Sequence, residues 1–147
     1  MSYADNFTKF IFDKFVVDAT FLDGYTFVLR NGSIERYDLN VDLSTEELEQ
    51  TKKVKELSIS QYGTNIAAYK NWIVIYDIKE DGEVLCDFYT KELELTRTYT
   101  FDIVADLYTQ INPDCELYNI THIKVHDRYT MIFYGYNTDE EMVAIKL

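Results

Sequence analysis

The sequence contains little of what reactive sites and tight loops are usually built from. Its 147 residues include one proline, five glycines and two cysteines. No glycine-rich loop that would cradle a phosphate is present, and no serine lies in a Gly-x-Ser-x-Gly elbow. Neither cysteine has the surroundings of a catalytic nucleophile. These absences favour a protein that is not an enzyme, and we expect no cofactor.

Basic residues are also scarce, with 14 Lys and Arg against 26 Asp and Glu and a net charge of −12. A protein that binds nucleic acid directly needs a basic face to neutralise phosphates, so we do not expect that partner. An acidic surface keeps a protein in solution or attracts a basic protein partner.

The two cysteines, Cys86 and Cys115, are far apart and do not have the spacing of metal ligands. Two free, buried thiols are typical of a reducing compartment, although one disulfide between them is the alternative. The first residues have no basic region followed by an apolar run, and no stretch is long and apolar enough to cross a bilayer. We therefore expect an intracellular protein, cytoplasmic or nuclear, without a membrane partner.

Aromatic residues are abundant, with 13 Tyr and 9 Phe, and hydrophobic residues make up 47% of the chain. This composition excludes a disordered chain and favours pleated, half-buried strands. No linker-like or low-complexity segment interrupts it. We therefore expect one β-rich domain over residues 1–147.

Two stretches have similar patterns, residues 18–39 and residues 56–78. Each reads as three strands separated by tight turns and ends on Tyr-Asp followed by an aliphatic residue. Asn31-Gly32 is the strongest hairpin signal, because a type I′ turn needs positive φ at both central positions. The patterns predict a three-stranded meander over 15–39, a four-stranded antiparallel unit over 54–90 and a third meander over 119–147.

Helices are predicted at two places. Ser44 and Glu47 form a capping box, which favours a short helix near 45–53. The spacing of Val104, Leu107, Tyr108 and Ile111 also suits a short helix.

The repeated units resemble blades of a β-propeller of the WD-repeat kind. Tyr37-Asp38 and Tyr76-Asp77 stand where that family often has Trp-Asp, and they are 39 residues apart. The resemblance implies two to three blades, whereas a closed propeller has about four to eight. A β-sandwich or barrel is the alternative fold.

Aromatic side chains and one terminal strand mark the candidate binding residues. The strand from Met142 to Leu147 is expected to leave a sheet edge unpaired, which is a template for strand addition. The expected partner-binding residues are Tyr129, Phe133, Tyr134, Tyr136, Met142 and Leu147. His122 and His126 are interpreted as ordinary polar residues, because four strand positions separate them by about 13 Å.

The sequence therefore predicts a non-catalytic protein-interaction module, an accessory subunit of a larger complex whose sheet is completed by a protein partner. Self-association is a second way to cover the exposed faces. The alternative function is a small acidic inhibitor, of the immunity or anti-defence type, that blocks a basic site on a partner enzyme.

Overall fold

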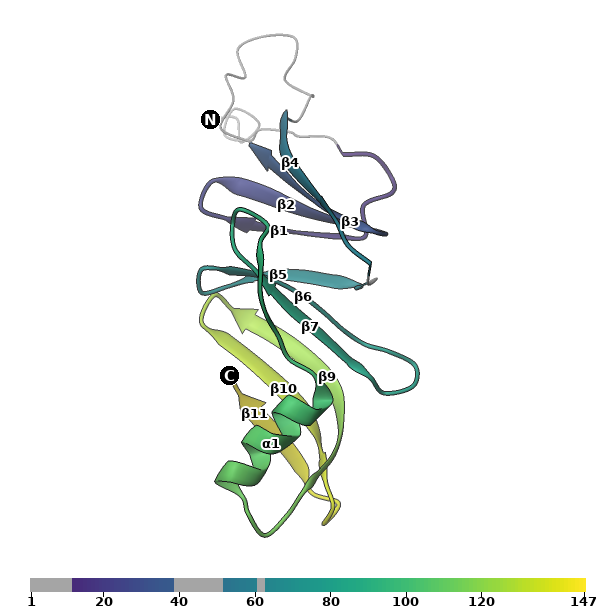
Figure 1. Cartoon of the computed structure of the whole chain (residues 1–147), viewed down its shortest axis with the longest axis vertical. Coiled ribbons are helices and arrows are strands. Elements are labelled where there is room, and N and C mark those ends of the chain that lie inside the picture. Colours follow the sequence, from purple (N-terminus) through teal and green to yellow (C-terminus); the bar gives the residue numbers. More distant parts are fainter. Residues whose placement is uncertain (1–11, 39–51, 61–62) are drawn as a thin grey trace, which may run out of the picture.

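The computed structural model describes residues 12–38, 52–60 and 63–147. These residues form eleven strands and one helix, and all strand pairs are antiparallel. The mainly β prediction is therefore confirmed. Three sheets, here named A, B and C, follow one another along the long axis of the molecule (Figure 1).

Sheet A has the strand order β1-β2-β3-β4. Its strands are β1 (Asp18–Leu22), β2 (Tyr25–Arg30), β3 (Ser33–Asp38) and β4 (Lys52–Ser58). The first three strands confirm the meander predicted over 15–39. In the turn between β2 and β3, Gly32 has a φ of 88°, but Asn31 is not among the residues with positive φ, so the type I′ geometry predicted at Asn31-Gly32 is wrong. The Asp23-Gly24 turn does have positive φ at both positions, 52° and 90°.

Sheet B has the order β5-β6-β7-β8 and lies between the other two. Its strands are β5 (Asn65–Tyr69), β6 (Trp72–Ile78), β7 (Val84–Tyr89) and β8 (Leu95–Thr98). Every residue of β7 is buried. A middle layer is covered on both faces, and its central strands therefore read as nearly continuous apolar runs.

Sheet C has the order β11-β10-β9. The helix α1 (Phe101–Ile111) precedes its strands β9 (Leu117–Asp127), β10 (Thr130–Asn137) and β11 (Met142–Lys146). These strands confirm the meander predicted over 119–147. The apolar spacing at 104–111 predicted the helix correctly, because Val104 and Tyr108 form its buried face.

Two core clusters join the layers. One lies between sheets A and B and includes Phe27, Leu29 and Ile73. The other joins sheet B to sheet C and α1, and includes Phe88 and Phe133. The first strands β1 and β5 lie side by side, as do β5 and β9. No sheet closes into a barrel, since each has two different edge strands.

Two predictions need correction or fall outside the described residues. The strand predicted at 54–60 was placed in the unit 54–90, but β4 pairs with β3, with Leu57 opposite Ile34. The fourth strand of sheet B is instead β8. Most of the helix predicted at 45–53 lies outside the described residues, and its last two positions, 52 and 53, belong to a strand.

Within the described ranges, no helix has the length and apolarity needed to cross a membrane. Cys86 and Cys115 are both buried and free, which settles the disulfide alternative against a bond.

Candidate interaction edge on sheet C

The three sheets differ in how their last strands are protected against pairing with another chain. The β3–β4 ladder has a register shift after Arg36, and β4 carries Lys53 and Lys55. Strand β8 has four residues and a register shift at its pairing with β7. Short strands, bulges and lysines all disfavour edge pairing. The β10–β11 ladder is regular over five pairs, and β11 has one lysine, Lys146. Strand β11 is therefore the least protected of these edges.

The hydrogen-bond pattern shows which backbone groups of β11 face away from β10. The amide of Leu147 donates to the carbonyl of Met131 at 2.9 Å, and the amide of Asn137 donates to the carbonyl of Glu141 at 3.0 Å. In an antiparallel ladder, hydrogen-bonded pairs alternate with non-bonded pairs. The odd-numbered residues of β11 therefore bond to β10. The N–H and C=O groups of Met142, Ala144 and Lys146 point toward the open edge.

A groove runs along this edge between β11 and the C-terminal half of α1. It has a volume of about 390 Å³. Tyr108 and Ile111 line it from the helix, and Val143 and Ile145 line it from the strand. Ile111 is 74% exposed, so an apolar side chain entering the groove would cover it. The edge therefore offers backbone groups and an apolar floor together.

A buried asparagine holds one end of the groove in place. Asn137 is 3% exposed, and its Nδ2 donates to the Tyr108 hydroxyl at 3.1 Å and to Glu141 Oε1 at 3.0 Å. Its Oδ1 accepts from the backbone amide of Glu141 at 2.9 Å. Asn112, the C-cap of α1, also donates to the Tyr108 hydroxyl, at 2.9 Å. These bonds tie the helix to the β10–β11 turn.

The predicted binding residues occupy three different environments. Tyr136 and Met142 form a cross-strand pair on the outer face of sheet C and are 43% and 66% exposed. Phe133 is 1% exposed and lies in the core. Leu147 is tied within the fold, because its carbonyl accepts from the Tyr69 hydroxyl at 2.7 Å. Of these four, Tyr136 and Met142 lie at the candidate edge with their side chains exposed.

The other two predicted residues are Tyr129, which precedes β10, and Tyr134, which pairs with Ala144 of β11. Tyr129 is 68% exposed in the β9–β10 turn. Tyr134 is half-buried on the outer face, where its hydroxyl lies 2.9 Å from His126 Nε2. His122 lies 3.0 Å from the Thr121 hydroxyl through Nδ1. Among the described residues, no group of three or more His, Cys, Asp or Glu is arranged to hold a metal ion.

The sequence did not indicate Ile111, Asn137 or Glu141 as site residues. In the sequence, Ile111 belongs to a helical stripe, and a stripe does not reveal which strand the helix faces. Asn137 lies in a turn-forming stretch, and Glu141 ends a run of three acidic residues. Asn137 is the last residue of β10, directly before the β10–β11 turn, where Asn is common, so its sequence context gives no sign of burial.

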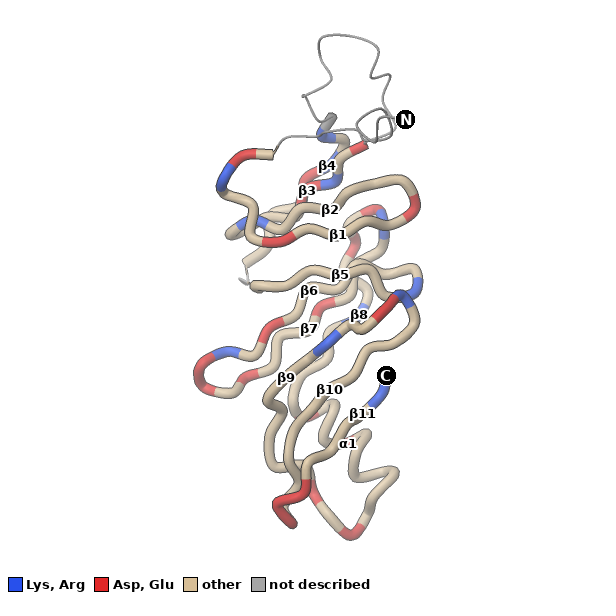
Figure 2. Tube along the Cα trace, turned by 180° about the vertical axis from the view of Figure 1, so that it is seen from behind, with Lys and Arg blue, Asp and Glu red and all other residues tan. Residues whose placement is uncertain are grey.

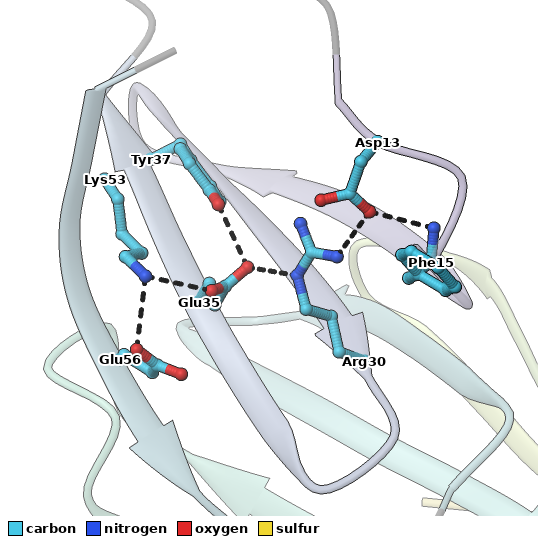
Figure 3. Close-up of polar contacts among 7 residues, drawn as sticks. All are labelled: Asp13, Phe15, Arg30, Glu35, Tyr37, Lys53 and Glu56. Carbon is cyan, nitrogen blue, oxygen red and sulfur yellow. Dashed lines mark hydrogen bonds and ion pairs between the residues drawn. The ribbon is translucent and has the colours of Figure 1, made fainter.

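A second polar cluster lies on sheet A (Figure 3). Glu35, whose side chain is 7% exposed, accepts from Arg30 Nε, from the Tyr37 hydroxyl at 2.9 Å and from Lys53 Nζ at 3.2 Å. Arg30 also pairs with Asp13 at 2.8 Å, and Phe12 packs edge-on against Tyr37. The cluster fastens the segment before β1 onto sheet A.

Burial of Glu35 acts to raise its pKa, but the hydrogen bonds from Arg30, Tyr37 and Lys53 outweigh it, and the pKa lies below its usual value. A catalytic carboxyl acid would need the opposite shift. Because each partner is satisfied, the cluster has the character of a structural ion-pair network.

No protein-family model matches the chain, and no curated protein matches it.

Proposed function

We propose that this protein is a non-catalytic interaction module, an accessory subunit of a larger assembly, and that a strand from a protein partner adds to β11. The observation that carries the proposal is the combination of a regular, unprotected edge with an apolar groove beside it. Strand addition gains main-chain hydrogen bonds along the edge, and the neighbouring groove receives alternate side chains.

The numbers of strands support the same proposal. Sheets A and B each have four strands, whereas sheet C has three among the described residues. An added strand would give sheet C four strands and, with β1, β5 and β9 adjacent, would extend a propeller-like series of sheets. The two free buried thiols are consistent with a reducing cytoplasm or nucleus. Nucleic acid is not proposed as a partner, because of the net charge of −12.

A second candidate function is inhibition of a basic enzyme site by an acidic surface. It is favoured by the three successive carboxylates of the β10–β11 turn, Asp139, Glu140 and Glu141. Ionic strength separates the candidates. The association rate of an electrostatically steered inhibitor falls steeply with added salt, whereas strand addition responds weakly.

Proline at Ala144 tests the strand-addition proposal. Since the amide of Ala144 points away from β10, Ala144→Pro removes an edge donor without removing a hydrogen bond of the sheet. Ala144→Val is the matched control, because it keeps the donor and adds bulk at the same exposed position. We expect a partner captured by the native chain and by A144V to be absent with A144P, while all three give the same far-UV circular dichroism.

Retention of the partner by A144P would refute strand addition. The same variants report self-association, since two copies joined antiparallel at Ala144 would place Met142 of one opposite Lys146 of the other. If the chain self-associates in this way, A144P would sediment as a monomer and A144V as a dimer.

A further inference from the structure

The groove beside β11 has a charged end as well as an apolar floor. Glu141 lines the groove at the end nearest the β10–β11 turn and is exposed to solvent. Its Oε1 accepts from Asn137, and no described Lys, Arg or His lies within ion-pair distance of the carboxylate. The groove therefore contains a carboxylate without a cation among the described residues.

The Glu141 carboxylate is also held in a fixed position. Asn137 binds both its side chain, at 3.0 Å, and its backbone amide, at 2.9 Å. Asn137 is itself buried and bonded to Tyr108 on α1. A charged group that is already ordered loses little conformational entropy when a ligand binds it.

Side chains alternate between the two faces of a strand, and this alternation places Glu141 on the same face as the apolar residues that line the groove. Val143 and Ile145 pair with Gly135 and Phe133 and lie on the inner face of sheet C with them. Glu141 is two residues before Val143, so the three positions follow one another on that face. A strand added beside β11 would place every second side chain opposite Glu141, Val143 and Ile145.

We infer that the partner strand carries a lysine or arginine opposite Glu141 and aliphatic residues opposite Val143 and Ile145. This inference rests on the proposed strand addition and names the chemistry of the partner. Lys or Arg would supply the missing cation, and aliphatic side chains would cover Ile111.

The charge distribution along the edge also favours a partner strand whose basic residue lies near the β10–β11 turn. Asp139 and Glu140 precede Glu141, so the turn carries three carboxylates in succession, whereas Lys146 lies at the other end of β11 (Figure 2). A basic residue near the turn is attracted by this field, and an acidic residue there is repelled. The edge thereby favours one charge order in the added strand.

Two synthetic peptides and one isosteric variant test the inference. The first probe is acetyl-Thr-Val-Thr-Val-Thr-Lys-Thr-amide, which places Lys opposite Glu141 when it pairs antiparallel with β11, and the second has Gln in place of Lys. Glu141→Gln keeps the oxygen that accepts from Asn137 while removing the charge. We expect the native chain to bind the Lys peptide about tenfold more tightly than the Gln peptide, as for one partly desolvated ion pair. We expect E141Q to bind both equally.

The outcomes separate this inference from the proposed function. Equal binding of both peptides by the native chain, lost in A144P, would overturn the assignment of Glu141 and leave strand addition intact. Binding of neither peptide by the native chain at millimolar concentration would overturn both. An equal loss of both peptides in E141Q would show that Glu141 acts on the shape of the groove and would also overturn its assignment as the cation site.

Discussion

Asp18 Oδ2 on β1 accepts a hydrogen bond from the backbone amide of Ile66 on β5 at 3.0 Å. Two residues further on, the Thr20 hydroxyl accepts from the amide of Ala68 at 3.0 Å. These amides face away from β6, so side chains of sheet A satisfy the free edge of sheet B. Strand β11 has the same kind of outward-facing amides and no such cover among the described residues. This contrast supports the assignment of β11 as the interaction edge.

Gly135 allows β9 and β10 to approach closely at a bulge. A Cβ atom at this position would lie 1.9 Å from the carbonyl oxygen of Asn119, which is a backbone atom. We expect Gly135→Ala to destabilise the protein by about 3 kcal/mol, measured by chemical denaturation, because the ladder must shift. The matched control is Gly82→Asn, since Gly82 has open space and a φ of 84° that Asn tolerates. A G135A variant as stable as G82N would contradict the close packing.

Glu35 is the centre of the charged cluster on sheet A. Glu35→Gln leaves Arg30 and Lys53 without their shared carboxylate, and we expect a loss of about 2 kcal/mol in the free energy of unfolding. Glu56→Gln is the control, because the Lys53–Glu56 pair is exposed to solvent and an exposed ion pair adds little to stability. Equal effects of the two substitutions would show that Glu35 is not an organising residue.

The same cluster predicts a dependence of stability on pH. The pKa of Glu35 is lower in the folded chain than its ordinary value of 4.5. Its ionised form therefore stabilises the fold fully above about pH 4.5, and this contribution is lost as the pH falls through the folded pKa. We expect the stability difference between the native chain and E35Q to shrink below pH 4.5, measured by urea unfolding. A difference that stays constant down to pH 3 would refute the ionised pair.

Cys86 is expected to be unreactive in the folded protein. Burial, together with the negative charge of Asp87, raises the pKa of the Cys86 thiol far above its usual range. Because the thiolate is the reactive form, a thiol reagent at neutral pH should leave Cys86 unmodified until denaturant is added. Peptide mapping after labelling distinguishes it from Cys115. Complete modification of Cys86 in the native state would show that the core of sheet B opens readily.

Local patterns predicted much of the fold. The hairpin turns at Asp23-Gly24 and Asn31-Gly32 define β1 to β3, because each joins strands that are neighbours in sequence and in space. The pairing of β4 with β3 was missed, since the two strands are separated by residues 39–51 and no local signal specifies the partner. The residues of a turn predict only the pairing of the two strands that the turn connects.

The candidate site could be predicted only in part, because it too depends on contacts between residues that are distant in sequence. Alternation shows that Phe133 and Tyr134 lie on opposite faces of β10, but it does not show which face packs against sheet B. The groove depends on contacts between α1 and β11, which are about 30 residues apart in sequence. The sequence therefore indicated the edge strand, whereas the helix beside it and the role of Asn137 required the three-dimensional structure.

Residue-resolved amide hydrogen exchange tests strand addition to β11 most directly. In the free protein, Val143 and Ile145 are expected to exchange slowly because their amides bond to β10, while Met142, Ala144 and Lys146 exchange quickly. On partner binding, protection should appear at Met142, Ala144 and Lys146 and change little at Val143 and Ile145. A partner that binds while these three amides remain fast would contradict strand addition.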